Sequence, residues 1–309
     1  MTTSQKTRFA FFGTPSLAVE ILDALEQAGY VPSIVVTMPD RQKGRGMELS
    51  QTPVAQWAEK RSIEILKPEK LDVEFTSALE ARRLKLSVVV AYGKILPQSV
   101  LDLMPMYNIH YSLLPRWRGA TPVESAILAG DMETGVSIQK IVYELDAGPL
   151  VALQKTKIDT NETGQALRRR LNGIAKDLLI KTMPDLLTGN MKLVEQDKTH
   201  ATFCGKITKK DGHIDLSDDG ELNYRKFRAY FGWPGVYTFF ERSGLNHAKD
   251  AVGQTDLPGK SVLGKKIRTI ITKAHLEGQK FIIDTVKPEG KGEMPYADFV
   301  RSGAVPVST

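Results

Sequence analysis

The chain has 309 residues, of which 41% are hydrophobic and 25% charged, and its formal net charge is +6. This composition is that of an ordinary globular protein, and the length is enough for two domains. No apolar run approaches the roughly 20 residues that cross a bilayer, and the single cysteine excludes an intrachain disulfide. We therefore expect a cytoplasmic protein without a signal peptide or membrane contact.

The basic excess is uneven along the chain. Residues 206–309 contain 17 Lys and Arg against 13 Asp and Glu, whereas residues 1–205 contain 25 against 23. A basic last third suits an anionic partner such as nucleic acid. On charge alone, however, a solvated basic surface explains the same excess.

The first elements predict a parallel sheet. Residues 8–13 are a short apolar run that ends in glycine, which indicates a buried strand. A helix should follow from Ser16 to Gly29, because apolar residues recur there at helical spacing. Residues 34–37 are a second β-branched run. This strand–helix–strand order favours two parallel strands joined by a right-handed crossover.

Further strands are expected at residues 87–93 and 107–111, and residues 135–141 and 150–158 should form a strand pair. A helix after Thr160 is predicted to bury one apolar face and to leave Arg168, Arg169 and Arg170 largely outside it. The predicted apolar face consists of Leu167, Leu171, Ile174 and Leu178.

The second half of the chain changes character. Residues 190–208 lack a clear period and are interpreted as a linker, which ends the first domain at residue 189. Within residues 209–309, short strand candidates at 235–240, 267–271 and 280–286 alternate with glycines and prolines, a pattern typical of a small β-barrel or sandwich. The predicted fold class is α/β, with a Rossmann-like, doubly wound, mostly parallel sheet followed by a small β domain.

The first strand does not end in a nucleotide motif. It runs into Gly13-Thr14-Pro15-Ser16, so both the Gly-x-Gly-x-x-Gly pattern and the Walker loop are absent. In doubly wound sheets, ligands bind outside the carboxyl ends of the strands. Gly13, Tyr92-Gly93 and the segment from Asn108 all fall at such predicted ends, which places the expected site there.

Asn108 and His110 are two residues apart and should face the same side of an extended segment, just before a Ser-Leu-Leu-Pro turn. The five histidines and Cys204 lack metal-ligand spacing, so no metal is expected, and no Gly-x-Ser-x-Gly elbow suggests a serine hydrolase. Asp146, in a turn between two predicted strands, is the obvious carboxylate to orient His110.

These three residue types suit acyl transfer to an amine. A neutral imidazole can take the proton that the attacking amine loses. The asparagine amide can donate a hydrogen bond to the developing oxyanion, while the carboxylate fixes the imidazole tautomer. The alternative for an isolated Asn-x-His is a core histidine beside a strand-end asparagine.

The wider segment decides between these interpretations. Asn108-x-His110-x-Ser112-Leu113-Leu114-Pro115-x-x-Arg118-Gly119 resembles the signature of the formyltransferases that use 10-formyltetrahydrofolate, with similar stretches at residues 91–97 and 145–148. The resemblance implies catalytic roles for Asn108, His110 and Asp146. It also implies that folate, as co-substrate, is bound by Ser112, Leu113, Leu114, Pro115, Tyr92 and Gly93.

Within this superfamily the chain is most similar to the methionyl-tRNA formyltransferases. The resemblance runs nearly from end to end, and its first matching stretches are residues 11–15 and 37–46. The resemblance implies that a formyl group passes to initiator methionyl-tRNA for translation initiation. It further implies a loop inserted after the second strand and a second domain, a β-barrel of oligonucleotide-binding type. We expect the protein to be a monomer. The residues expected to contact tRNA are Arg41, Lys43, Arg45, Lys206 and Lys209.

The chain departs from the family pattern in three places. Residues 47–50 are less basic than in many relatives, Asp215-Leu216 replaces the usual Asp-Trp pair, and residues 241–266 resemble no part of the family. Two alternatives remain at this point. One is a nucleotide-sugar N-formyltransferase, against which the Gly44-Arg45-Gly46 loop and the basic second domain argue. The other is an RNA- or folate-binding protein without catalysis, which would not require the Asn-His-Asp set.

Overall fold

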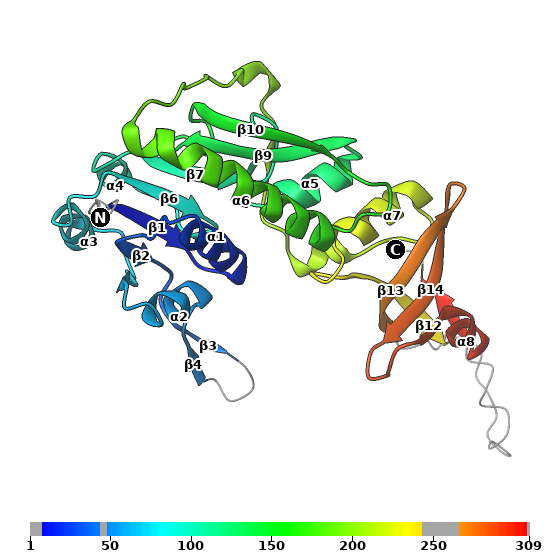
Figure 1. Cartoon of the computed structure of the whole chain (residues 1–309). Helices are drawn as coiled ribbons and strands as arrows, with labels where there is room; N and C mark the ends of the chain where they lie inside the picture. Colours follow the sequence, from blue (N-terminus) through cyan, green and yellow to red (C-terminus); the bar gives the residue numbers. More distant parts are fainter. Residues whose placement is uncertain (1–7, 44–47, 243–265, 308–309) are drawn as a thin grey trace, which may run out of the picture. The chain divides into compact units, whose positions relative to one another are not determined.

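The computed structural model describes residues 8–43, 48–242 and 266–307. The chain divides into two compact units, which are described separately (Figure 1). Unit 1 contains the residues up to 123 together with 132–158 and 166–205. Unit 2 contains residues 124–131, 159–165 and the chain from 206 onward.

A seven-stranded sheet forms the centre of unit 1, in the order β10-β9-β7-β6-β1-β2-β5. The five strands from β7 to β5 are parallel, whereas β9 is antiparallel to β7 and β10 is antiparallel to β9. The mostly parallel sheet expected from the sequence is thus confirmed. The strands are β1 (Phe9–Gly13), β2 (Ile34–Val36), β5 (Glu64–Leu66), β6 (Leu86–Val90), β7 (Met106–His110), β9 (Glu133–Lys140) and β10 (Leu150–Lys157).

Every residue of β1, β2 and β6 is buried, because helices cover both faces of the parallel part of the sheet. Alternate side chains of these strands pack with α3 (Val73–Glu80) and α4 (Gln98–Leu101) in one apolar cluster, which includes Phe12. Phe11 points to the opposite face. There it lies near α1 (Ser16–Gln27), since a Cβ on Gly13 would meet both the Phe11 ring at 2.7 Å and Ala18 at 2.9 Å.

Helix α6 (Gly164–Thr188) lies beside α1 on the same face of the sheet (Figure 1). Buried Asn172 joins the two helices by donating to Leu17 O at 3.3 Å and to Glu20 Oε2 at 2.8 Å. The predicted buried face is partly wrong. Ile174 and Leu178 are half-buried, because the core-facing residues follow a four-residue spacing, with Leu167, Leu171, Ala175, Leu179 and Met183 fully buried.

A hairpin of β3 (Arg41–Lys43) and β4 (Glu48–Ser50) follows β2 and precedes α2 (Pro53–Glu59). It occupies the position at which the sequence predicts the inserted loop. The tip, which includes Arg45, lies outside the described residues.

The chain after α6 packs on unit 1. Val194 forms a two-way backbone bridge with Leu150, and β11 (Phe203–Cys204) pairs with β8 (Arg118–Gly119) in parallel. Part of the segment interpreted as a linker therefore belongs to the same compact unit as the sheet.

Unit 2 is built on an open, curled antiparallel sheet with the order β15-β14-β13-β12-β16 (Figure 1). The three strands predicted from the sequence are confirmed as β12, β13 and β14, and the sheet curls as a half-barrel. Residues 243–265, most of the stretch without family resemblance, lie outside the described part. The elements are α5 (Pro122–Ala129), α7 (Gly220–Ala229), β12 (Val236–Arg242), β13 (Ile267–Glu277), β14 (Lys280–Pro288), β15 (Met294–Pro295), α8 (Tyr296–Arg301) and β16 (Ala304–Pro306).

Among the described residues, no helix has both the length and the apolar character that crossing a membrane requires.

We expect Gly173→Ala to stabilise the protein. Gly173 lies within α6, and a Cβ at this position would meet no atom within 4 Å. Because glycine costs a helix interior about 1 kcal/mol relative to alanine, the free energy of unfolding should rise by roughly 0.5–1 kcal/mol. Calorimetry should detect the change as a higher thermal midpoint.

Gly135→Ala is the contrasting variant. Gly135 lies in β9, and an added Cβ would stand 2.2 Å from Gln154 O of the neighbouring strand, so its thermal midpoint should fall. A Gly173→Ala protein that melts at or below the wild-type temperature would contradict the helical environment described for α6.

Candidate active site

Hydrogen bonds join the loops at the carboxyl edge of the sheet in unit 1. Thr14, directly after β1, donates from Oγ1 to Tyr92 O at 2.8 Å, and the Met38 amide donates to the same Oγ1 at 3.4 Å. One hydroxyl therefore links the chain segments that follow β1, β2 and β6. These hydrogen bonds connect the loops at the carboxyl edge of the sheet, where the sequence predicts the ligand site.

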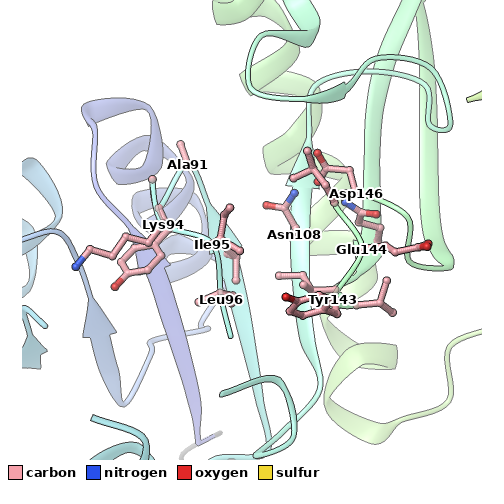
Figure 2. A pocket seen from close by; sticks show the side chains of 15 residues that line it. Ala91, Lys94, Ile95, Leu96, Asn108, Tyr143, Glu144 and Asp146 are labelled. Atoms are coloured by element: carbon pink, nitrogen blue, oxygen red, sulfur yellow. Dashed lines mark hydrogen bonds between the residues drawn. The ribbon is translucent and has the colours of Figure 1, made fainter. Parts of the chain in front are cut away.

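A pocket opens at this edge and encloses about 710 Å³ of space, including the solvent at its mouth. One wall is the segment after β6 and the other is the turn after β9, while Asn108 of β7 lies between them (Figure 2). Apolar side chains at the mouth are strongly exposed, with Ile95 at 81% and Tyr143 at 71%. The pocket thus combines an apolar rim with a polar floor formed by Asn108, Gln139 and Asp146.

Tyr92 closes the pocket toward the core. Its ring meets Phe12 edge-on, with centroids 5.3 Å apart and planes at 88°. Burial raises the pKa of Tyr92 to about 12, because the phenolate would lose its hydration. The hydroxyl therefore stays neutral at physiological pH.

His110 is the last residue of β7 and is 5% exposed. Its Nε2 lies 2.8 Å from Trp117 O, and since a carbonyl oxygen can only accept, Nε2 must donate. Nδ1 lies 3.7 Å from Asp146 Oδ2. The nitrogen that can change its protonation is thus Nδ1, which faces the carboxylate.

Asp146 lies in the turn between β9 and β10, with a left-handed backbone at φ 48°. Its Oδ2 accepts from the Gly119 amide and its Oδ1 accepts from Gln139 Nε2, both at 2.8 Å. Two donors from separate strands therefore fix the carboxylate next to His110.

Asn108 pairs with Gln139 across the antiparallel β7–β9 ladder. The Asn108 side chain is half-buried and lines the pocket together with Asp146. Within the described part of the chain no hydrogen bond involves its amide, so this donor is available to a ligand. The structure brings all three predicted catalytic residues to one place, with Asn108 and Asp146 in the pocket wall and His110 behind Asp146.

The predicted folate contacts divide into two groups. Tyr92 and Gly93 line the pocket. The Ser112–Pro115 turn makes internal contacts instead: buried Ser112 donates to Arg116 O at 2.6 Å, and the Leu114 amide donates to Ser137 Oγ at 3.1 Å. The bond to Ser137 anchors the turn to β9, whereas the bond to Arg116 closes the turn itself. A direct role of Ser112, Leu113, Leu114 and Pro115 in folate binding stays a prediction.

The predicted tRNA contacts lie on both units. Arg41 is exposed on β3, and Lys43 belongs to the same strand. Lys206 and Lys209 are exposed in unit 2. Arg45 falls outside the described residues, so the structure does not place it.

Sequence reasoning missed Gln139 and Gln196, and it named Arg118 only as a member of the signature, without assigning it a role. Gln139 lies in a predicted strand, but the order of residues along the chain does not reveal the strand register that places it opposite Asn108. Gln196 lies in a segment without periodicity, and nothing in the sequence marks it as buried. Among the described residues, no group of three or more His, Cys, Asp or Glu side chains could hold a metal ion.

Solved structures share this fold. A sugar 3N-formyl transferase, WlaRD, determined in the presence of dTDP and 5-N-formyl-THF, superposes with a TM-score of 0.60 at 15% identity, covering 93% of this chain and all of that one. HypX from Aquifex aeolicus in complex with tetrahydrofolic acid gives a TM-score of 0.60 at 15% identity, over 96% of this chain and 47% of that one. At this identity the likeness concerns the fold alone.

Sequence comparison identifies the family. Residues 7–183 match the family described as formyl transferase, and residues 206–303 match the formyl transferase C-terminal domain. A methionyl-tRNA formyltransferase of Thermus thermophilus is 37% identical over 98% of both chains, and one of Thermotoga maritima is 41% identical over 75% of both. The chain therefore belongs to the formyltransferases, and within them to the methionyl-tRNA formyltransferase family.

Proposed function

We propose that this chain transfers the formyl group of 10-formyltetrahydrofolate to the α-amino group of initiator methionyl-tRNA, giving formylmethionyl-tRNA for translation initiation. The observation that carries the chemistry is the single pocket that contains Asn108 and Asp146, with His110 Nδ1 3.7 Å from the Asp146 carboxylate. Family membership over nearly the whole chain supports the acceptor.

The pocket fits the donor. A folate head group is flat and aromatic, with several hydrogen-bonding nitrogens, and such ligands need apolar walls with a few polar groups. Ile95, Tyr143 and Leu145 offer exposed apolar surface at the mouth, and the floor is polar. The solved structures of similar fold that were determined with 5-N-formyl-THF and with tetrahydrofolic acid support the same assignment. When bound, the donor supplies a formyl carbon that an amine can attack.

His110 acts as the proton acceptor. Because its Nε2 donates to Trp117 O, Nδ1 is the nitrogen that can take the proton that the attacking amine loses, and Asp146, which lies between His110 and the pocket, can share that proton. The imidazolium that results faces the negative Asp146 across 3.7 Å. In a site with little water this attraction is stronger than in bulk solvent, so Asp146 stabilises the charge that forms on His110.

Asn108 acts on the oxygen of the formyl group. As the amine nitrogen bonds to the formyl carbon, negative charge collects on that oxygen. A side-chain amide already held at the pocket wall can donate to it without reorganisation. The carbon–nitrogen bond to the donor then breaks, and the imidazolium can return its proton to the departing nitrogen.

The acceptor contacts follow from charge and position. Arg41 is exposed on strand β3 of the hairpin, which ends at Lys43. We assign tRNA contacts to Arg41, Lys43, Arg45, Lys206 and Lys209 because phosphate attraction requires such cations. We assign catalysis to domain 1–189 and tRNA binding to domain 209–309. The enzyme is proposed to work as a monomer in the cytoplasm.

A nucleotide-sugar N-formyltransferase is the second candidate, because structures of sugar N-formyltransferases share the fold. The two functions separate in one assay. Purified protein is given 10-formyltetrahydrofolate with either charged initiator tRNA or an amino-sugar nucleotide, and formylated product is measured. We expect formylation of the tRNA only; product from the sugar alone would refute the proposal.

Removing the two reacting groups should affect turnover far more than donor binding. We expect Asn108→Ala to lower kcat/KM by about 10²–10³-fold and His110→Ala by about 10²–10⁴-fold. Donor affinity, measured by calorimetry, should stay near wild type because both groups act in the transition state.

The matched control is Asn190→Ala, since Asn190 is exposed beyond the end of α6 and should not alter either quantity. Equal losses in donor affinity and in turnover for the Asn108 and His110 variants would argue against transition-state roles.

Arg41→Ala tests the hairpin. We expect KM for tRNA to rise with kcat nearly unchanged, and the slope of log KM against log salt to fall by about one, since one phosphate contact is lost. Arg83→Ala is the control, because exposed Arg83 precedes β6 at the opposite edge of the sheet. If both variants behave alike, the hairpin has no specific contact with tRNA.

A further inference from the structure

Gln196 is a buried amide in the segment that the sequence predicts as a linker. Its side chain is 7% exposed and lies against the Asp146 turn. Gln196 Nε2 donates to Asp146 O at 2.9 Å and to Gly148 O at 2.7 Å. A single amide thus ties together the two carbonyls on either side of Ala147.

The orientation of this amide is fixed by its other partner. Gln196 Oε1 accepts from Arg118 Nη2 at 2.7 Å and from Arg118 Nε at 3.2 Å. A guanidinium has only donors, so the oxygen of Gln196 must face Arg118, and its NH₂ group must then face the carbonyls. Arg118 itself is 5% exposed, which leaves this charge little access to water.

Gln139 continues the chain of hydrogen bonds. Its Oε1 accepts a longer hydrogen bond of 3.3 Å from Gln196 Nε2. Its own Nε2 donates to Asp146 Oδ1 at 2.8 Å. The amides therefore point the same way, from Arg118 through Gln196 and Gln139 to the carboxylate. Aligned hydrogen bonds of this kind strengthen one another in a buried setting.

We propose that Gln196 is a positioning residue for formyl transfer, which holds the Asp146 turn and, through Gln139, aims the Asp146 carboxylate at His110. The turn needs such a partner because Asp146 has a left-handed backbone at φ 48°, a conformation that a non-glycine residue keeps only when its surroundings enforce it. This inference rests on the proposed function for its kinetic consequence, but its structural part stands without it.

Two substitutions of Gln196 separate positioning from packing. Gln196→Leu removes both the acceptor and the donor. Gln196→Glu keeps the shape and the acceptor for Arg118, but its carboxylate faces the carbonyls of Asp146 and Gly148 without a hydrogen to donate. If Gln196 merely packs or pairs Arg118, the glutamate variant should behave as wild type.

We expect both variants to lower kcat by about 10- to 100-fold, by analogy with the loss of outer hydrogen-bond partners of metal ligands. KM for the formyl donor and for tRNA should change by less than about threefold, because Gln196 touches neither substrate. Gln154→Leu is the matched control: Gln154 is exposed on β10, and among the described residues its side chain donates only to Lys155 O.

The Gly119 amide provides a readout independent of activity. It donates to Asp146 Oδ2 at 2.8 Å, so hydrogen exchange at this amide reports whether the carboxylate remains in place. We expect exchange at Gly119 to accelerate by about tenfold or more in both Gln196 variants and to stay unchanged in Gln154→Leu.

The outcomes are distinct. Wild-type kcat in Gln196→Glu, or unchanged Gly119 exchange in folded Gln196→Leu, overturns the positioning role. A wild-type protein that formylates no methionyl-tRNA refutes the proposed function, and Gly119 exchange still decides the positioning. If neither Gln196 variant folds, Gln139→Met decides, since it loses both the donor to Asp146 and the acceptor for Gln196. Unchanged kcat and Gly119 exchange in this variant would overturn the inference.

Discussion

The site depends on the antiparallel pairing of β7 with β9. This pairing places Asn108 opposite Gln139 and His110 opposite Ser137, and it places the end of β9, Lys140, opposite Tyr107 near the amino end of β7. The chain that follows β9 therefore starts at the amino end of β7 and folds back along the strand before Asp146 reaches Gln139 and His110. The reversed strand β9 thus supplies Gln139 and, through the chain that follows it, Asp146 to a site whose Asn108 and His110 come from the parallel strand β7.

The backbone around the site is held in uncommon conformations. Ala91, Trp117 and Asp146 all have positive φ, at 48°, 60° and 48°, and each such residue costs of order 1 kcal/mol or more. Two of them supply the groups that face the His110 ring, namely Trp117 O and the Asp146 carboxylate. The strain is offset by bonds from elsewhere, including the Gly119 amide on Asp146 and the Thr202 hydroxyl, which accepts from the Trp117 amide.

Local sequence signals predicted the parts of the structure that local physics determines. Apolar runs identified β1, β2, β6 and β7, and the Asn-x-His spacing identified two side chains on one strand face. Short strands such as β8 and β11, of two residues each, contain no period to detect. Gln196 meets Gln139 across 57 residues of sequence, and such a contact depends on register and on the path of an aperiodic segment, which composition and spacing do not encode.

On the proposed function, different groups of unit 1 serve the chemistry and the choice of acceptor. The pocket with Asn108 and Asp146 shares Ala91, Tyr92 and Gly93 with a second pocket, which is lined on its other side by Arg41, Gln42 and Ser50 of the β3–β4 hairpin. Enzymes with sugar acceptors share the same fold at 15% identity, so the fold by itself does not select a tRNA. Under the proposed function, selection comes from groups that an acceptor meets beside Asn108, His110 and Asp146. The hairpin pocket shares Ala91, Tyr92 and Gly93 with the pocket of Asn108 and Asp146, and we therefore propose the hairpin for that distinction.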